Sequence, residues 1–323
     1  MFDQPNQVQQ PIIRSDKEGN CFEMREINCP TCGSEASQKF VGIRGGATHR
    51  FGKGVECRIS RCKRCGLYFP NPFPFPVDPQ QLYGDPDKYF ISHDMDKKID
   101  NFRQLIRGFI DSMGRKNLSI LDVGSGRGEL LAAAKAEGIS RVVGLELSSS
   151  MIEYAKQKFC VEVVAEVIED FAAHNGEKFD VIVLNAVLEH VYNPDSMIAA
   201  CADLLSPNGM LYIDIPNEDH LLARIGGLIN HVRNRPEVFV LSPTFTPYHV
   251  FGFSKRSLRA LLDKHGFEIE KIRVHAKIKS RTTGGISGGV IAAVELSLHF
   301  IANFVGMASN MYVWARYSHH SEN

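Results

Sequence analysis

The pattern of apolar and polar positions changes in character near residue 119. From there on, short apolar runs have the length and composition of buried strands. Stretches with apolar residues three and four positions apart follow them, as expected for amphipathic helices. This alternation predicts a Rossmann-like, doubly wound α/β sheet. The expected strands are residues 119–123, 141–147, 161–165, 178–184, 210–215, 266–275 and 311–317.

Ahead of this domain the pattern predicts a connector. Residues 70–79 hold five prolines, which exclude a regular helix or a central strand and indicate a semi-rigid link. Apolar positions at helical spacing over 95–113, closed by Gly114, predict a helix that leads into the domain. Tyr83 and Tyr89 are candidates either for packing or for lining the entrance of a site.

The chain therefore divides into four parts. We expect a disordered polar lead-in at 1–27, a small module at 28–70, the connector and helix at 71–118, and the main domain at 119–323.

Two parts of the main domain depart from the alternation. Residues 218–253 are an insertion after the fifth strand, and we expect them to lie as a lid over the carboxyl edge of the sheet, where the substrate must sit. Residues 290–307 are strongly apolar, with Glu295, His299 and Asn303 as one polar stripe. Such a helix could pack in the core or in a homodimer, or it could lie on a membrane beside a lipid-linked substrate. An acidic residue inside it argues against a transmembrane span.

Composition is that of an ordinary soluble globular protein, with 44% hydrophobic and 23% charged residues among 323. The formal net charge is zero, so no overall field steers the chain toward nucleic acid or anionic lipid. The N-terminal residues are polar and lack the apolar core of a secretory signal, so we expect a cytoplasmic protein.

Four of the eight cysteines form two Cys-x-x-Cys pairs, Cys29 with Cys32 and Cys62 with Cys65. Without an export signal, this usage favours metal binding over disulfides. Two such knuckles supply the four thiolates of a tetrahedral, structural Zn²⁺ site, and the residues between them predict the short strands of a zinc ribbon. Redox-active or free pairs are the alternative, but no thioredoxin-like βαβ pattern surrounds them.

The segment between the cysteine pairs is basic. Residues 39–65 contain eight Lys or Arg residues and a single acidic one, Glu56. A solvated face beside the thiolates is the simpler interpretation, and a phosphate-bearing partner such as RNA or a nucleotide-linked substrate is the other. Cys57 or His49 from this segment could also replace one zinc ligand.

The turn after the first strand of the domain carries the main functional signal. Gly124, Gly126 and Gly128 form a loop without side chains between a buried strand and a helix start, which suits a nucleotide-like ligand. A dinucleotide fingerprint would need a third glycine at position 129, which is Glu129. A carboxylate at the helix start repels a pyrophosphate but tolerates a cationic ligand, as does Asp122.

Residues beyond the loop fit the other parts of such a ligand. Glu146 stands at the end of the second strand, about twenty residues past the glycines, where a carboxylate can accept hydrogen bonds from ribose hydroxyls. Met151, in the following helix, is placed to cover an adenine face. Glu166 could accept a hydrogen bond from an adenine amine.

Four motifs together carry a family resemblance. LDVGSGRG, GLELS, FDVIVLNAVLEHV and LSPNGMLYIDIPN occur in this order between residues 80 and 275. In this combination the chain resembles the class I S-adenosylmethionine-dependent methyltransferases. Among them it looks like the small-molecule enzymes similar to ubiquinone-biosynthesis O-methyltransferases and to sugar methyltransferases with an N-terminal zinc module.

The resemblance implies a seven-stranded sheet with an antiparallel seventh strand and a pocket for S-adenosylmethionine. Asp122, Gly124 and Gly126 would shape the part of the pocket that holds the methionine moiety. Glu146 would bind the ribose, and the backbone of Asn185 would lie beside the sulfonium. The expected cofactor-binding residues are Asp122, Gly124, Ser125, Gly126, Glu146, Leu147, Met151, Glu166, Val167 and Asn185.

Methyl transfer is an in-line displacement, so such an enzyme must align a nucleophile with the sulfonium and exclude water. A hydroxyl or acidic C–H acceptor also needs a base. The resemblance points to His249, just ahead of the expected helix 254–265, with Tyr248 as a weaker partner. A structural histidine bonded to a loop carbonyl is the alternative. Glu189 and His190 are interpreted as caps of the helix after the fourth strand.

These observations predict a methyltransferase that acts on a small-molecule acceptor such as a sugar, a glycan precursor or a natural-product intermediate. A zinc-module RNA base methyltransferase is the alternative. It is disfavoured because residues 185–188 lack the Asn/Asp-Pro-Pro-aromatic set that grips a base amine and no Pro-Cys follows the fourth strand. A cofactor-binding scaffold without chemistry is the third hypothesis, against which the intact glycine loop argues.

Overall fold

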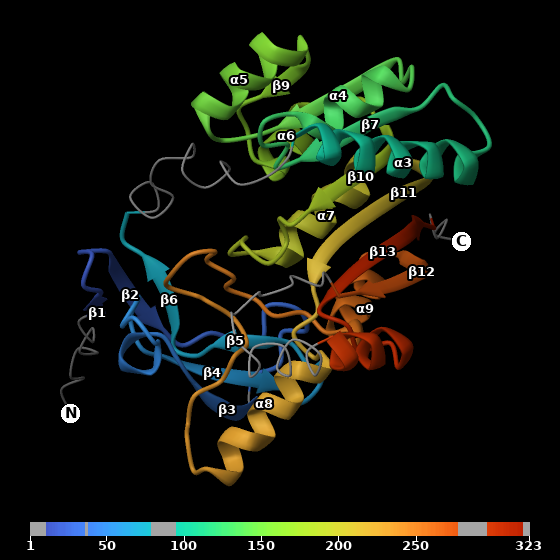
Figure 1. Cartoon of the computed structure of the whole chain (residues 1–323). Helices are drawn as coiled ribbons and strands as arrows, with labels where there is room; N and C mark the ends of the chain where they lie inside the picture. The colour runs from blue at the N-terminus through green and yellow to red at the C-terminus, as the bar shows by residue number, and fades with distance from the viewer. Residues whose placement is uncertain (1–10, 36–37, 79–94, 277–295, 319–323) are drawn as a thin grey trace, which may run out of the picture.

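The computed structural model describes residues 11–35, 38–78, 95–276 and 296–318. A seven-stranded sheet forms its centre, with the strand order β12-β13-β11-β10-β7-β8-β9 (Figure 1). Neighbouring strands are parallel except β13, which runs antiparallel to both β11 and β12. The expected Rossmann-like sheet with an antiparallel seventh strand is confirmed. Its strands are β7 (Ser119–Val123), β8 (Arg141–Leu145), β9 (Glu162–Val164), β10 (Phe179–Asn185), β11 (Leu205–Pro216), β12 (Phe267–His275) and β13 (Asn310–Tyr317).

Strand β10 is covered on both faces, and its alternate residues belong to two separate cores. Val181 and Val183 pack with side chains of α3 and α4, whereas Ile182 and Leu184 pack with side chains of α6, α7 and α9. A strand buried on both faces has a continuous apolar run, which is why this segment shows no polar alternation. The helices are α3 (Met95–Met113), α4 (Glu129–Ala136), α5 (Ser149–Phe159), α6 (Ile168–His174), α7 (Pro194–Leu204), α8 (Leu221–Val232) and α9 (Lys255–Lys264).

Two three-stranded antiparallel sheets precede the main domain. One is the ribbon expected around the cysteine pairs, with the order β3-β4-β5, and the other has the order β1-β2-β6. Their elements are β1 (Ile12–Ser15), β2 (Cys21–Arg25), β3 (Gln38–Arg44), β4 (Cys57–Cys62), β5 (Tyr68–Pro70) and β6 (Phe73–Pro76), with one 3₁₀ turn, η1 (Gly46–Thr48). We refer to residues 12–76 as the N-terminal module.

The expected disordered lead-in over residues 1–27 is wrong for residues 12–25, which contain β1 and β2. Alternation within β2 buries Phe22 and Met24 in a cluster shared with β4. β6 pairs with β2 at the edge of this sheet, and prolines are tolerated there because an edge strand needs no partner on its outer side. Part of the proline-rich connector is therefore a strand of the module.

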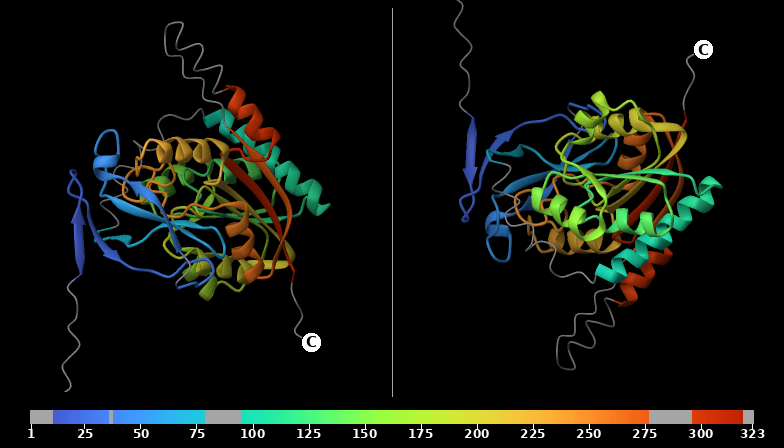
Figure 2. Two further views of the ribbon diagram at one scale, coloured as in Figure 1. Left: turned by 90° about the horizontal axis from the view of Figure 1, so that it is seen from below. Right: turned by 90° about the horizontal axis from the view of Figure 1, so that it is seen from above.

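Backbone hydrogen bonds attach the insertion that follows β11 to the N-terminal module. The Ile43 amide donates to the Pro236 carbonyl at 2.8 Å, and the Val238 amide donates to the Ile43 carbonyl at 3.1 Å. Tyr68 and Gly252 exchange two further bonds of 2.9 and 2.8 Å. Figure 2 shows the blue module on one flank of the molecule and the sheet with its helices on the other. The insertion thus bridges the two parts.

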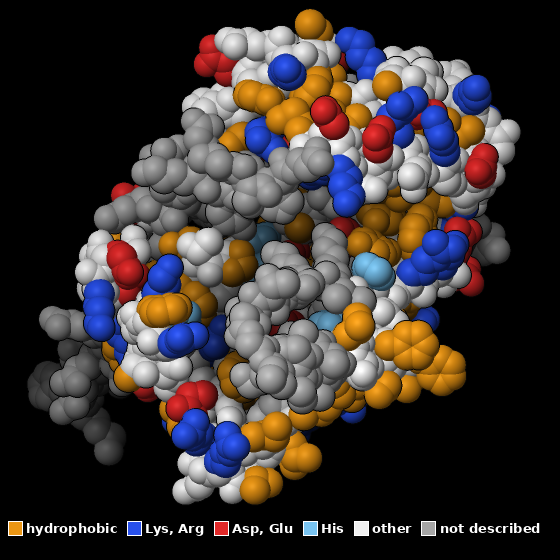
Figure 3. Space-filling model, in the orientation of Figure 1, with side chains coloured by type: hydrophobic (Ala, Val, Ile, Leu, Met, Phe, Trp, Pro, Cys, Tyr) orange, Lys and Arg blue, Asp and Glu red, His pale blue; other side chains and the backbone are white. Residues whose placement is uncertain are grey.

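The apolar segment near the C-terminus is helical at 296–304, and its start lies outside the described residues, as do Glu295, Tyr83 and Tyr89. Phe300 is 73% and Phe304 86% exposed, so most of this helix is not packed in the core of the chain. Figure 3 shows apolar side chains gathered along the lower right edge of the molecule. A homodimer or a peripheral membrane contact through 290–307 stays a prediction. Within the described ranges, no helix combines the length and the apolarity that a bilayer span requires.

Candidate active site

The glycine loop lies between the carboxyl ends of β7, β8 and β10. The amides of Gly124 and Ser125 both donate to the Leu145 carbonyl, at 2.8 and 2.9 Å, which ties the loop to the end of β8. Gly124 has a φ of +69°, and a Cβ there would lie 2.7 Å from the Val187 side chain. A Cβ at Gly126 would meet no atom within 4 Å, so the space above the middle of the loop is open. The loop therefore presents its backbone at Gly126 to open space.

Glu146 is held at the end of β8 by three backbone amides. One carboxylate oxygen accepts from Gly126 at 2.9 Å, and the other accepts from Leu147 at 2.8 Å and Ser148 at 2.9 Å. A carboxylate has about four acceptor positions, so roughly one remains for a ligand hydroxyl. Binding both hydroxyls of a ribose would require one of these amides to give way.

The start of helix α4 is occupied by a buried, paired carboxylate. Glu129 is 2% exposed and lies 3.0 Å from the Arg127 guanidinium and 3.4 Å from the Lys98 ammonium. Its side chain takes the place at the helix N-terminus where a pyrophosphate would bind, but the two cations compensate its charge. The exclusion of a dinucleotide phosphate therefore stays a prediction.

Asp122 is buried beneath the loop. Burial, reinforced by Glu129 and Glu146 and opposed by Lys98, raises the pKa of Asp122 to about 8. The hydroxyl of Ser125 is buried without a hydrogen-bond partner among the described residues. A ligand that carries positive charge and hydrogen-bonding groups would satisfy both, so the residues present fit a cationic sulfonium nucleoside.

The residues expected around an adenine differ in how accessible they are. Leu147 is 67% and Val167 39% exposed, whereas Met151 is 2% exposed within α5. Glu166 lies in the turn after β9, and its carboxylate contacts the His174 ring nitrogen at 2.8 Å. The Glu146 amide donates to the Val164 carbonyl at 3.1 Å, which brings the ends of β8 and β9 together. The adenine contacts themselves stay predictions.

Asn185 ends β10 beside the glycine loop. The next residue, Ala186, has a φ of +56°, and its amide donates to the Asp214 carbonyl on β11 at 2.9 Å. The chain then turns so that Val187 faces Gly124. The backbone at Asn185 is thus placed where the sequence expects the reactive end of the cofactor, and its role there stays a prediction.

A cluster of Glu189, His190 and His249 lies just beyond this turn. The Glu189 carbonyl accepts from the amides of Val250 at 2.9 Å and Phe251 at 3.2 Å, which fastens the insertion to the exit of β10. The rings of His190 and His249 have centroids 4.9 Å apart in an edge-to-face arrangement. We call these three residues the 189/190/249 cluster. Interpreting Glu189 and His190 as helix caps missed it, because Asn193 caps α7 instead.

Burial dominates the titration behaviour of this cluster. Burial, with the neighbouring His190, lowers the pKa of His249 to about 3. Burial, with the charges of Asp214 and Glu218, raises the pKa of Glu189 to about 8. Both imidazoles are therefore neutral at physiological pH and can accept a proton or bind a cation. His249 lies beside Glu189 and His190, and its low pKa makes it a weak base. Its role as the base stays a prediction.

Tyr248 contributes its backbone to the cluster. Its carbonyl lies 3.2 Å from Nδ1 of His190. Its phenol ring packs against apolar residues of β2, β4 and the 238–241 segment. Burial, with Asp16 and Glu18, raises the pKa of this phenol. A role for the Tyr248 hydroxyl in the reaction stays a prediction.

The four cysteines of the two pairs converge as one set. Sγ of Cys29 lies 3.5 Å from Sγ of Cys65, Sγ of Cys32 lies 3.6 Å from Sγ of Cys62, and all four lie within 4.8 Å of one another. A tetrahedral Zn²⁺ with bonds of about 2.3 Å needs sulfur separations close to these. Burial raises the pKa of Cys62, but hydrogen bonds from the amides of Cys65 and Arg64 and from the thiols of Cys32 and Cys29 together lower it to about 7. The donor set fits a zinc ion.

The alternative zinc ligands are placed elsewhere. Cys57 is fully buried in the apolar cluster of β2 and β4, and its thiol donates to the Val55 carbonyl. The His49 ring packs on Phe245, with centroids 4.6 Å apart. Neither belongs to the thiolate set.

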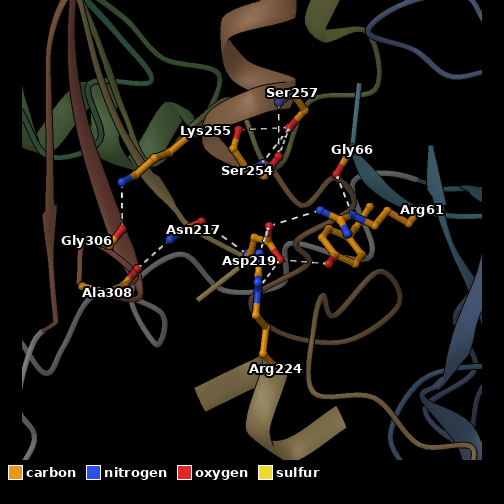
Figure 4. A network of polar contacts seen from close by, with 11 residues as sticks. Arg61, Gly66, Asn217, Asp219, Arg224, Ser254, Lys255, Ser257, Gly306 and Ala308 are labelled. Carbon is orange, nitrogen blue, oxygen red and sulfur yellow. Dashed lines mark hydrogen bonds and ion pairs between the residues drawn. The ribbon is translucent and has the colours of Figure 1, made fainter. Parts of the chain in front are cut away.

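A second link between module and insertion centres on Asp219, at the start of the insertion (Figure 4). Its carboxylate accepts from Arg61 at 3.1 Å, from the Tyr68 hydroxyl at 3.3 Å and from Arg224 at 3.0 and 2.8 Å. Arg44 likewise donates to carbonyls of the insertion. Basic residues of the module are thus engaged inside the chain.

Comparison with known proteins agrees with this geometry. Residues 91–272, more than half of the chain, match the family model described as a methyltransferase domain. The chain belongs to this methyltransferase family. The resemblance to class I S-adenosylmethionine-dependent methyltransferases is thereby confirmed.

Curated relatives are ubiquinone biosynthesis O-methyltransferases. The methyltransferase chain is 32% identical to that of Salmonella paratyphi A over 140 residues, which cover 40% of this chain and 57% of the relative. It is 30% identical to that of Neisseria meningitidis serogroup C over 138 residues, covering 39% and 57%. The chain therefore spans somewhat more than half of the length of these relatives.

Solved structures show a more distant likeness. A methyltransferase from Archaeoglobus fulgidus, described as SAM-dependent, has a TM-score of 0.49 and 21% identity, covering 74% of this chain and all of that one.

Proposed function

We propose that this methyltransferase transfers a methyl group from S-adenosylmethionine to a small-molecule acceptor such as a sugar, a glycan precursor or a natural-product intermediate. The observation that carries the proposal is the juxtaposition of two sites at the exit of β10. On one side Gly124 packs against Val187, and on the other the insertion is bonded to Glu189. A cofactor at the glycine loop and an acceptor under the insertion would meet there.

Different residues at the glycine loop would bind different parts of the cofactor. Asp122 supplies negative charge near the loop once it has lost its proton, and Glu146 has acceptor capacity left for a ribose hydroxyl. S-adenosylmethionine, when bound, supplies a methyl group on a positively charged sulfur. The insertion, which backbone bonds hold to both the module and β10, would cover the reacting atoms.

The acceptor must lose a proton if its reacting atom is a hydroxyl oxygen. Its lone pair takes the methyl group, the carbon–sulfur bond pair stays on sulfur, and the proton has to leave toward a basic group. The 189/190/249 cluster supplies the candidates, and His249 is the base proposed from the sequence. Neutral imidazoles can receive this proton.

We also propose that a structural Zn²⁺ occupies the four-cysteine set. The module it stabilises packs Leu67, Phe69 and Phe73 into the same apolar core as Phe251 and Phe253 of the insertion. The zinc would therefore stabilise the module that packs against the insertion, and it would not take part in the methyl transfer.

The basic segment of the module favours this interpretation over RNA binding. Arg44 and Arg61 bond to the insertion, and the Arg58 guanidinium lies over the Phe40 ring at 4.8 Å. These cations bridge parts of one chain, so a phosphate-bearing partner is not needed to account for them.

A labelling experiment tests the proposal. The protein is incubated with S-adenosylmethionine carrying an isotopic label in its methyl group and, in separate reactions, with low-molecular-weight metabolites or total RNA. We expect label in the metabolite fraction. Label confined to RNA would refute the small-molecule assignment, and label in neither fraction would refute the methyl-transfer proposal.

A further inference from the structure

Besides the four thiolates, one group among the described residues brings three potential metal ligands together, and it is the 189/190/249 cluster. One ligand atom from each residue lies within 4.8 Å of the other two. The donors come from two separate segments, because Glu189 and His190 follow β10 whereas His249 belongs to the insertion. Two imidazoles and one carboxylate are a donor set used for divalent cations that keep open coordination positions.

Hydrogen bonds hold the ring of His190 and the main chain of His249. Nδ1 of His190 faces the Tyr248 carbonyl at 3.2 Å, and a carbonyl can only accept, so this nitrogen carries the proton. Nε2 of His190 is then a lone-pair donor. The backbone of His249 is fixed by the amide and hydroxyl of Ser242, at 3.1 and 3.2 Å. A bond from the second ring nitrogen, as His190 makes, orients a metal-binding histidine.

The carboxylate of Glu189 is the second, independent observation. Glu189 is 2% exposed, and its Oε2 is buried without a hydrogen-bond partner among the described residues. Its other oxygen lies 3.9 Å from Nε2 of His190, too far for a hydrogen bond. Such an oxygen is costly to bury unless a cation or a donor meets it. The nearby charged groups Asp214 and Glu218 are also acidic, so neither supplies a cation to it.

We propose that Glu189, His190 and His249 bind a divalent cation, and that the hydroxyl oxygen of the acceptor occupies one of its open positions. A cation that binds this oxygen makes the hydroxyl more acidic. Its proton then leaves to solvent water, the oxygen forms the new bond to the methyl carbon, and the carbon–sulfur bond pair stays on sulfur as the sulfonium becomes a thioether. His249 is in this case a ligand, and the cation takes over the activation otherwise assigned to it. This inference rests on the proposed function and names its acceptor class as a hydroxyl compound.

Mn²⁺ is the probe that separates this site from the thiolates. It stands at the weak end of the divalent affinity series and prefers oxygen and nitrogen donors, so it does not displace Zn²⁺ from four cysteines. Zinc-loaded protein is titrated with Mn²⁺, and free Mn²⁺ is measured by electron paramagnetic resonance. We expect one Mn²⁺ per chain in the wild type.

Two variants and a matched control locate the bound ion. Glu189→Gln keeps the shape of the side chain and His249→Gln removes an imidazole, and each should weaken Mn²⁺ binding by at least about tenfold. His231→Gln, at the exposed end of α8, should bind as the wild type does. Binding of S-adenosylmethionine, measured on the same samples by calorimetry, shows that each variant is folded.

The outcomes are distinct. No Mn²⁺ bound by the wild type, or equal binding by wild type and both cluster variants, would overturn the metal proposal. Either result would leave the methyltransferase proposal standing as long as S-adenosylmethionine still binds. Absence of S-adenosylmethionine binding, with Mn²⁺ bound, would instead overturn the proposed function and keep the metal site.

Discussion

Replacing Glu146 by glutamine tests how the glycine loop is organised for its ligand. In the wild type the two oxygens accept three backbone amides, from Gly126, Leu147 and Ser148. Glutamine keeps the size of the side chain but offers one oxygen and one NH₂ group. At least one of the three amides would then face a donor instead of an acceptor.

The magnitude follows from these bonds. A hydrogen bond to a charged group contributes about 1.5–3 kcal/mol, and the partial exposure of these three places each near the lower end. The substitution removes one of these bonds, takes the charge away from the other two and weakens the contact to the ribose hydroxyl. Together these losses should cost about 2 kcal/mol of binding free energy. Since 1.4 kcal/mol is tenfold, S-adenosylmethionine should bind about 30-fold more weakly.

Isothermal titration calorimetry of S-adenosylmethionine into the wild type and Glu146→Gln measures this difference. Glu153→Gln is the matched control, because Glu153 is exposed on α5 and bonds to Gln157 one turn further on. The control should bind as the wild type does. If Glu146→Gln, folded by circular dichroism, bound within about threefold of the wild type, the role given to Glu146 would be refuted.

Three further predictions concern charge, zinc and the module. The affinity for S-adenosylmethionine should rise with pH up to about 8 and then level off, because Asp122 must lose its proton to carry a charge opposite to that of the cation. Below this pKa of about 8, the affinity should rise by up to about tenfold per pH unit. A flat pH profile of the affinity, measured by calorimetry, would contradict this prediction. Asp219→Asn should lower the free energy of unfolding by about 1 kcal/mol, and the loss is modest because the paired arginines are 37% and 57% exposed. Urea unfolding measures this loss, with Asp263→Asn as the exposed control. An equal loss in both variants would count against the role of Asp219 in joining the module to the insertion. Removing zinc with a chelator should raise the KM for the acceptor more than the Kd for S-adenosylmethionine, since the described residues of the module bond through their backbone to the insertion and not to the glycine loop. Equal effects on both constants would point to general unfolding.

The sheet and the cofactor loop could be predicted because their signals are local. The continuous apolar run of β10 and the glycines after β7 report on residues that are neighbours in the sequence. The position of Glu129 at the start of α4 could be predicted for the same reason. The ion pairs with Arg127 and Lys98, one of them from another helix, could not be predicted in this way.

The N-terminal strands and the 189/190/249 cluster depend on distant partners. Phe22 and Met24 are buried only because β2 pairs with a proline-containing edge strand and packs on β4. Glu189 and His190 meet His249 through bonds to an insertion whose path the sequence pattern does not define, with Tyr248 58 positions from His190. The spacing of apolar residues along the sequence predicts neither the partners of β2 nor the approach of His249 to Glu189 and His190.

The most direct test of the account is a calorimetric comparison of S-adenosylmethionine with NAD⁺ as ligands of the wild-type protein. The acidic lining of Asp122 and Glu146 and the occupied helix start at Glu129 predict one S-adenosylmethionine bound per chain and no detectable NAD⁺ binding. Binding of NAD⁺, or no heat from S-adenosylmethionine in folded protein, would contradict it.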